Sequence, residues 1–108
     1  MLNQIVLVGR LVENIKVQGE NDRKYAVIKL AVPRSFKNAE GEYETDFIDC
    51  ITFEGVAENT ANYCKKGDII GVKGRIQSRV CEKYHTKQNI IEIIAEKITF
   101  LSSKKEND

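Results

Sequence analysis

The chain has 108 residues, of which 42% are hydrophobic and 31% are charged, and its formal net charge is +1. This length and composition are typical of one globular domain with its own core, and they exclude a disordered or fibrous chain. No apolar run is long enough to cross a bilayer, and the first residues do not have the pattern of a signal peptide. Three cysteines and one histidine predict no disulfide framework, no metal and no cofactor, and they fit the reducing cytoplasm.

The first predicted strand covers residues 3–12 and contains the apolar run Ile5–Val8. An unbroken apolar run is typical of a strand buried on both faces, either inside a closed barrel or against a partner subunit. Gly9 interrupts this run, which indicates close packing or a bend at that point. A second strand is predicted over residues 24–33, and Pro33 is expected to end it because proline cannot donate a ladder hydrogen bond.

Aromatic and basic side chains gather in the polar loop over residues 34–44 and in the third predicted strand, Thr45–Phe53. Four of the eight aromatic residues of the chain lie here, near Arg34 and Lys37. Strand side chains alternate, so Phe47, Asp49, Ile51 and Phe53 share one face.

Rings interleaved with cations are typical of a platform on which nucleobases stack while phosphates are neutralised. The alternative is that Phe47 and Phe53 are ordinary core residues.

One helix is predicted after the third strand, within residues 56–67, because small and apolar residues recur there at helical spacing. Its buried side is expected to include Thr60 and either Tyr63 or Cys64. Lys65 and Lys66 fall in its predicted last turn, where cations suit the helix dipole, and Gly67 is predicted to end it.

Two long strands are predicted to follow, over residues 69–84 and 90–101, joined by a polar tip at residues 85–89. Gly71 and Gly74 predict strong bending of the first of these strands. Three strands, one helix and two strands together predict an all-β, five-stranded Greek-key barrel of the OB-fold type, with the short helix between the third and fourth strands.

We expect the OB-fold domain to cover residues 1–102 and the charged segment 103–108 to be disordered. No catalytic motif is visible, and His85 is expected to be a solvated loop residue, so we predict a protein that is not an enzyme.

Several strings together resemble bacterial single-stranded DNA-binding proteins. LNQIVLVGRL is similar to the first strand of that family, and LAVPRSFKNAEGEYETDFIDCITF is similar to its strand–loop–strand DNA platform. AENTANYCKKGDIIGVKGRIQSR is similar to its helix and fourth strand, so the resemblance covers nearly all of residues 1–101. It implies an OB-fold that binds single-stranded DNA without sequence preference in replication, recombination and repair. It also implies a homo-oligomer, a tetramer rather than a dimer, associated with the nucleoid in the cytoplasm.

The resemblance also implies roles for individual residues by their position in these strings. It implies base stacking at Phe36, Phe47 and Phe53. It implies phosphate contacts at Arg34, Lys37, Lys66, Lys73, Arg75 and Arg79.

The chain departs from the family pattern at several positions. Cys81 stands where the family usually carries an aromatic residue, and Tyr84 is expected to replace it as a fourth stacking residue. Asp49 and Glu54 place acids on or beside the DNA face. The family's acidic tip, which recruits replication and repair partners, does not occur in KKEND, so this recruitment is not expected. The alternative function is an OB-fold module that binds RNA or a primosome-type protein partner.

Overall fold

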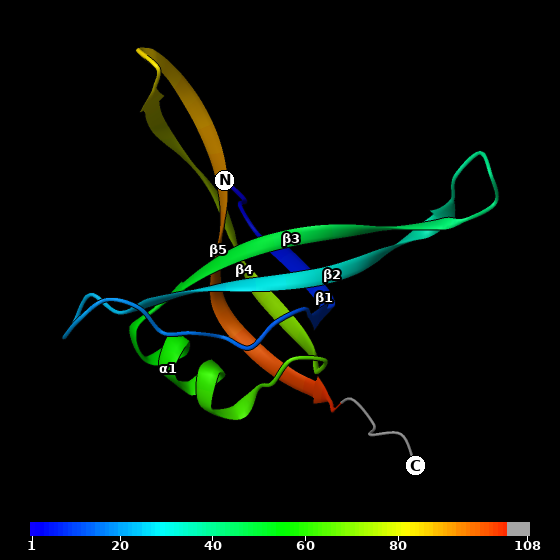
Figure 1. Ribbon diagram of the computed structural model, residues 1–108, viewed down its shortest axis with the longest axis horizontal. Helices are drawn as coiled ribbons and strands as arrows, with labels where there is room; N and C mark the ends of the chain where they lie inside the picture. The colour runs from blue at the N-terminus through cyan, green and yellow to red at the C-terminus, as the bar shows by residue number, and fades with distance from the viewer. Residues whose placement is uncertain (104–108) are drawn as a thin grey trace.

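A computed structural model of the protein describes residues 1–103 (Figure 1). Its elements, in chain order, are β1 (Ile5–Leu11), β2 (Tyr25–Lys37), β3 (Tyr43–Phe53), α1 (Glu54–Tyr63), β4 (Ile69–Lys83) and β5 (Thr86–Ser102). The strands close into a barrel in the order β1-β2-β3-β5-β4. The predicted five-stranded barrel with one helix between the third and fourth strands is therefore confirmed.

The predicted division into a domain over 1–102 and a disordered segment over 103–108 stays a prediction, since residues 104–108 lie outside the described part of the chain. Within residues 1–103, no helix is long and apolar enough to cross a membrane.

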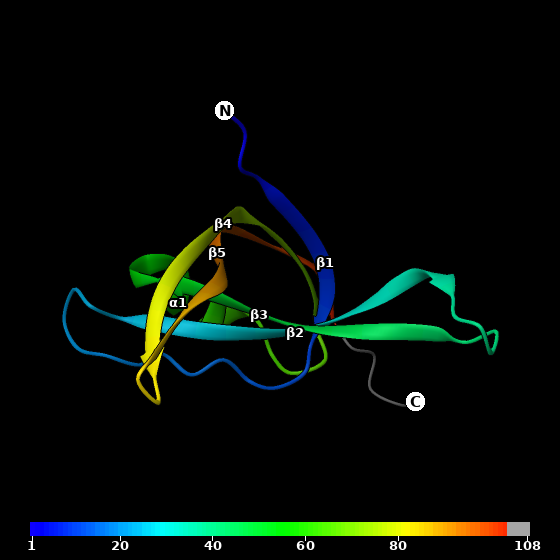
Figure 2. The ribbon, with the colours of Figure 1, turned by 90° about the horizontal axis from the view of Figure 1, so that it is seen from above.

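Neighbouring strands pair antiparallel except β3 and β5, which run parallel and close the barrel. The ladder between β4 and β5 is long, and it extends into a hairpin that projects beyond the barrel (Figure 1). β1 pairs with β4 over Ile5–Arg10 but with β2 only through Arg10 and Leu11. Figure 2 shows β2 and β3 on one side of the barrel and β1 and β4 on the other.

The hydrophobic core fills the barrel and continues under α1. Its largest fully buried side chains include Leu11, Ile28, Leu30, Ile70 and Val72. The helix buries residues on its barrel side, and the cysteine just after it is also buried. Because the even-numbered residues in the first half of β2 and in the last part of β3 point into this core, the odd-numbered residues of the same segments face outward.

The helix is shorter than the sequence predicts, because α1 ends at Tyr63. The carboxylate of Asp68 accepts a hydrogen bond from the backbone N–H of Lys65 at 2.8 Å, and this bond holds a turn in front of β4. Lys65 and Lys66 therefore lie after the helix, and their predicted place in its last turn is wrong. Gly67 lies within the same turn at a φ of +95° instead of ending the helix.

Strands β2, β3 and β5 are longer than predicted, and β4 ends one residue earlier than predicted. Pro33 does not end β2, which continues to Lys37. Among the described residues, Pro33 pairs with β3 but not with β1. One edge of β2 is therefore free at this point, and the missing N–H of proline is tolerated there.

The predicted polar tip at residues 85–89 is also wrong, because Tyr84 and His85 alone join β4 to β5. Both residues have positive φ, 54° and 63°, as a type I′ hairpin turn requires. The sequence signal for this turn is weak because neither residue is Asn or Gly.

Gly74 is the residue that permits the sharp bend of β4. It lies next to a register shift between β4 and β5, and a Cβ at this position would overlap the backbone carbonyl of Ile94. At Gly71 a Cβ would make only ordinary contacts, the nearest being 3.7 Å from the side chain of Leu101. The predicted bending of this strand therefore depends on Gly74 and not on Gly71.

We expect Gly74→Ala to lower the free energy of unfolding by about 3 kcal/mol, because the new methyl group forces the β4 and β5 backbones apart. Denaturant unfolding monitored by circular dichroism measures this change. Gly71→Ala is the matched control and should change the same quantity by less than about 1 kcal/mol. Equal stability of the two variants would contradict the assignment of the bend to Gly74.

Candidate nucleic-acid interface

The outward face of β2 and β3 carries four cross-strand pairs of side chains. In order along the strands they are Phe47–Ala31, Asp49–Lys29, Ile51–Val27 and Phe53–Tyr25. We call these eight residues the platform. Residues directly opposite each other in an antiparallel ladder have neighbouring side chains. The platform therefore has aromatic side chains at both ends and one charged pair between them.

The two phenylalanines of the platform are exposed. Phe47 is 74% exposed and Phe53 is 49% exposed, whereas Cys50 between them is fully buried. Ile48 packs against the core from the same inward side. The expectation that the odd-numbered side of this strand faces outward is confirmed, and the alternative that both rings belong to the core of this chain is wrong.

Tyr25 and Lys29 complete the platform, although the sequence had not singled them out. Tyr25 lies opposite Phe53, and its hydroxyl donates a hydrogen bond to the side-chain oxygen of Gln18 at 3.2 Å. Lys29 lies opposite Asp49. The signal that identifies both residues is the register of β2 on β3, which depends on where the hairpin turns.

The β2–β3 hairpin projects from the barrel (Figure 1). Two more exposed rings, Phe36 near the end of β2 and Tyr43 at the start of β3, lie at its far end. The ammonium group of Lys37 lies 5.7 Å from the centre of the Tyr43 ring, within the range of a cation–π interaction. The side-chain oxygen of Asn38 accepts hydrogen bonds from two backbone N–H groups and closes the loop. Phe36 therefore lies farther along the projecting hairpin than Phe47, at a register irregularity between β2 and β3.

Arg34 is bound to two carboxylates beside the platform. Its guanidinium donates to both oxygens of Asp46, at 2.9 to 3.2 Å, and to Glu44 at 2.6 Å. The hydrogen bond from Arg34 lowers the pKa of Asp46, and the positive charge of Arg34 adds to this effect. A phosphate that approaches Arg34 must compete with these two acids.

The remaining predicted phosphate contacts divide into two kinds. Arg79 pairs with Glu92 at 3.1 Å, and Arg75 pairs with Glu96 at 3.6 Å. Lys37, Lys66 and Lys73 are exposed and form no ion pair with other residues of the range 1–103. Among the predicted phosphate contacts, these three lysines are therefore the ones that a phosphate reaches without displacing a carboxylate.

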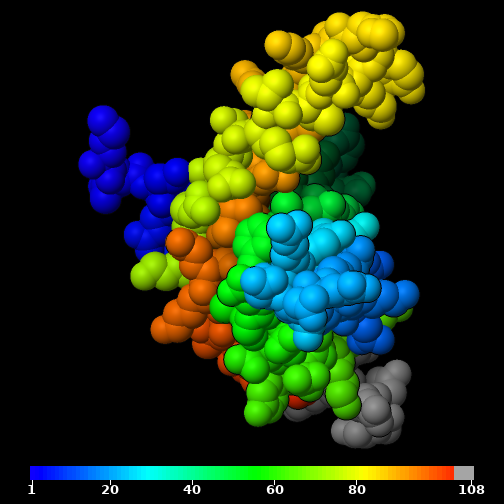
Figure 3. Space-filling view, turned by 90° about the vertical axis from the view of Figure 1, so that its left-hand side faces the viewer, coloured from blue at the N-terminus to red at the C-terminus, as the bar shows by residue number. Residues whose placement is uncertain are grey.

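Tyr84 lies at the tip of the β4–β5 hairpin and is 86% exposed. Figure 3 shows this hairpin standing clear of the body of the molecule, and Figure 1 shows it leaving the barrel in a different direction from the β2–β3 hairpin. Cys81 lies on the same hairpin, opposite Gln88, and is half-buried. The structure thus places Tyr84 apart from Phe47 and Phe53, at another edge of the candidate interface.

The cysteines on β3 and after α1 are not activated for nucleophilic chemistry. Burial raises the pKa of the Cys50 thiol to about 11, and the nearby charge of Asp49 adds to this effect. Burial also raises the pKa of Cys64, with Asp68 contributing. Within residues 1–103 no group of His, Cys, Asp or Glu side chains is arranged to hold a metal ion. The arrangement of exposed rings and cations suits binding.

We expect Arg34→Gln to raise the pKa of Asp46 toward its ordinary value, because the variant removes the charged donor that stabilises the carboxylate. Carbon-13 NMR titration of the side-chain carboxyl measures this pKa. The lowered pKa also means that stability from the pair is present above the ordinary pKa of Asp and is lost as the pH falls through the lowered value. Lys37→Gln, which removes a cation of the same hairpin that forms no ion pair with Asp46, should leave the titration unchanged.

Comparison with known proteins places the chain in a family. The model of the "Single-strand binding protein family" matches residues 2–101. The chain is 44% identical to single-stranded DNA-binding protein 3 of Listeria innocua, and 42% and 43% identical to the proteins B and A of the same name in Bacillus subtilis. Each alignment covers 96% of this chain, and they cover 66%, 94% and 62% of those three relatives.

The fold has a solved counterpart. The structure described as "Plasmodium falciparum SSB complex with ssDNA" superimposes with a TM-score of 0.79 at 24% identity, over 94% of this chain and 96% of that one. The barrel is an OB-fold, as the order of its elements predicts. With a family match over nearly its whole length and relatives of this identity, the chain belongs to the single-strand binding protein family.

Proposed function

We propose that this protein binds single-stranded DNA without sequence preference, by stacking bases on exposed rings and contacting phosphates with basic side chains. The observation that carries the proposal is the exposure of Phe47 and Phe53 on the outward face of β3, beside Tyr25. Rings held in a row on a sheet offer a π-face to any base. The names of the relatives support the same function.

Stacking supplies most of the binding free energy in this proposal. We assign it to Phe36, Phe47, Phe53 and Tyr84, and we add Tyr25. Each base stacked on a ring contributes about 1–3 kcal/mol, from which the cost of ordering the strand is subtracted. A duplex hides the faces of its bases inside its own stack, so it cannot use these rings. Discrimination against duplex DNA follows from the same interaction that provides affinity.

The proposed role is to hold and protect single strands in replication, recombination and repair, without catalysing a reaction. The family to which the chain belongs is named for binding, the described residues form a surface of rings and cations, and burial raises the pKa of the Cys50 and Cys64 thiols. We place this role in the cytoplasm, with the nucleoid.

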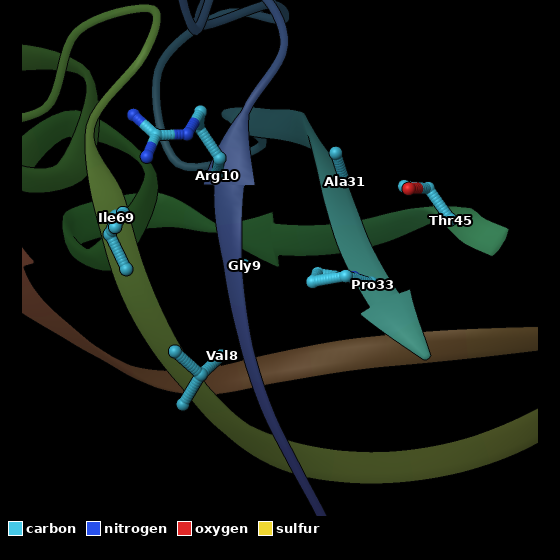
Figure 4. A pocket seen from close by; sticks show the side chains of 7 residues that line it. All are labelled: Val8, Gly9, Arg10, Ala31, Pro33, Thr45 and Ile69. Carbon is cyan, nitrogen blue, oxygen red and sulfur yellow. The ribbon is translucent and has the colours of Figure 1, made fainter. Parts of the chain in front are cut away.

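We also propose that the protein is a homo-oligomer, a tetramer rather than a dimer, that associates through β1. Val6 is 66% exposed and Val8 is 51% exposed, although they belong to the most apolar segment of the first strand. Val8 also borders a hollow of about 310 Å³ that lies between β1 and β2 (Figure 4). Since β2 pairs only with Arg10 and Leu11 of β1, the preceding residues of β1 offer an apolar face and a strand edge to a second copy.

We expect Phe47→Ala to weaken the binding of a homopolymeric DNA strand by about 1–3 kcal/mol, because one stacking surface is lost. Its free energy of unfolding should change little, since the ring is exposed. Fluorescence anisotropy at two salt concentrations measures the affinity, with duplex DNA and RNA as competitors. Tyr63→Ala removes a ring of 78% exposure from α1 and serves as the control that should bind normally.

Two results of this experiment would contradict the proposal. Unfolding of the Phe47→Ala variant, with normal binding by the folded remainder, would return Phe47 to the core. Stronger competition by RNA or by duplex than by single-stranded DNA would favour a different ligand.

We expect light scattering to give a mass that is a multiple of the 12.3-kDa chain at micromolar concentration. Val8→Glu should shift the mass toward that of one chain, because a carboxylate at the proposed contact is costly to bury. Val17→Glu places the same charge at a less exposed valine outside β1 and should leave the mass unchanged. A stable monomer of the unmodified chain would rule out the proposed association.

A further inference from the structure

Each arginine that is predicted to contact phosphate already has a carboxylate partner. The pairs are Arg34–Asp46 at 2.9 Å, Arg34–Glu44 at 2.6 Å, Arg79–Glu92 at 3.1 Å and Arg75–Glu96 at 3.6 Å. A surface made to attract a polyanion by charge alone would leave its arginines open to phosphate. The charges on this surface are instead largely balanced within the protein.

An average ion pair on a protein surface contributes little to stability. The ion pairs of two of these arginines have additional contacts that hold the guanidinium in place. Arg34 binds both oxygens of Asp46, and this two-pronged geometry fixes the guanidinium. Glu92 is only 13% exposed, and it also accepts a hydrogen bond from the amide of Gln77 at 3.3 Å. If Arg79 moved to a phosphate, it would leave a mostly buried carboxylate without its cation.

The centre of the platform is balanced in the same way. Asp49 lies between Phe47 and Phe53 in sequence and on the same outward face, where a passing phosphate meets its charge. Lys29 is directly opposite Asp49 in the register of β2 on β3. A hollow of about 400 Å³ beside this pair is lined by one further cation, Lys16, and one further anion, Glu13. The formal charges at this point of the platform therefore cancel.

We propose that acidic side chains set the salt dependence of single-strand binding in this protein, by holding Arg34, Arg75 and Arg79 in ion pairs and by placing the charge of Asp49 opposite Lys29. Of the six cations predicted to contact phosphate, contact is then left to the three that form no ion pair within residues 1–103, which are Lys37, Lys66 and Lys73. The inference rests on the proposed function and specifies which residues regulate its electrostatic part. Asp49 and Asp46 act through their cationic neighbours, so they are positioning residues.

The number of phosphate contacts sets how steeply binding weakens as salt rises. The logarithm of the binding constant falls by about 0.7 for each phosphate contact per decade of salt concentration when the ligand is a single strand. Three lysines give a slope of about 2, whereas all six predicted cations would give a slope of about 4. The two values are far enough apart to be distinguished by titrations over about one decade of NaCl concentration.

The experiment measures this slope for the unmodified chain and its variants with a fluorescent homopolymeric DNA strand. Asp49→Asn should raise the slope by about 0.7 and tighten binding roughly fivefold at about 0.1 M salt, because Lys29 becomes a phosphate contact. Asp46→Asn should act in the same direction through Arg34. The double variant Lys29→Ala with Asp49→Asn restores the neutral pair and should restore the original slope. The single variant Lys29→Arg keeps the positive charge opposite Asp49, so it should retain the original slope.

Asp22→Asn is the matched control, since it removes the same charge from a turn outside the platform, and it should leave the slope unchanged. A slope of about 4 for the unmodified chain would overturn the inference while leaving the proposed function intact. An effect of Asp49→Asn no larger than that of Asp22→Asn would overturn it as well. Failure of the unmodified chain to bind the strand at any salt concentration would overturn both.

Discussion

The antiparallel register of β2 on β3 is the constraint on which the rest of the structure depends. A slip by one residue would turn every side chain of one strand to the opposite face, so that Phe47 would enter the core and Cys50 would face water. The inward side chains of both strands fix the register by filling the barrel, and the buried hydroxyl of Thr52 adds a hydrogen bond to the carbonyl of Ala95 on β5. Core packing thereby positions the exposed rings, because the same backbone carries both sets of side chains.

Closure of the barrel decides how the candidate interface is distributed. β3 pairs with β5 through a short parallel ladder, and the β4–β5 ladder shifts its register next to Gly74, where the two backbones approach closely. The β4–β5 hairpin leaves the barrel away from the β2–β3 hairpin (Figure 1). Phe36 and Tyr84 therefore lie on separate projections, with Phe47 and Phe53 on the barrel wall. A flexible single strand is able to follow such a curved surface, whereas a rigid duplex is not.

Local patterns in the sequence predict the parts of the structure that depend on local rules. Alternation placed Phe47 and Phe53 on one shared face, the family resemblance implied that this face points outward, and the order of elements identified the barrel. The helix end and the hairpin tip were mispredicted, because one depends on Asp68 reaching back to Lys65 and the other on two residues with unusual φ. The roles of Tyr25 and Lys29, and the acids bound to Arg34, depend on contacts between different strands, which a single sequence does not display.

The balanced charges and the exposed rings act together on which nucleic acids the surface favours. A strongly basic surface attracts every polyanion, single-stranded or not, and loses affinity steeply as salt rises. A surface whose arginines are held by carboxylates loses that general attraction and keeps the interaction that only unpaired bases satisfy, which is stacking. In the proposed function, Asp49 lies between two exposed rings and contributes to selectivity, since its charge weakens the contact shared by all nucleic acids and leaves the proposed stacking rings on either side available to bases.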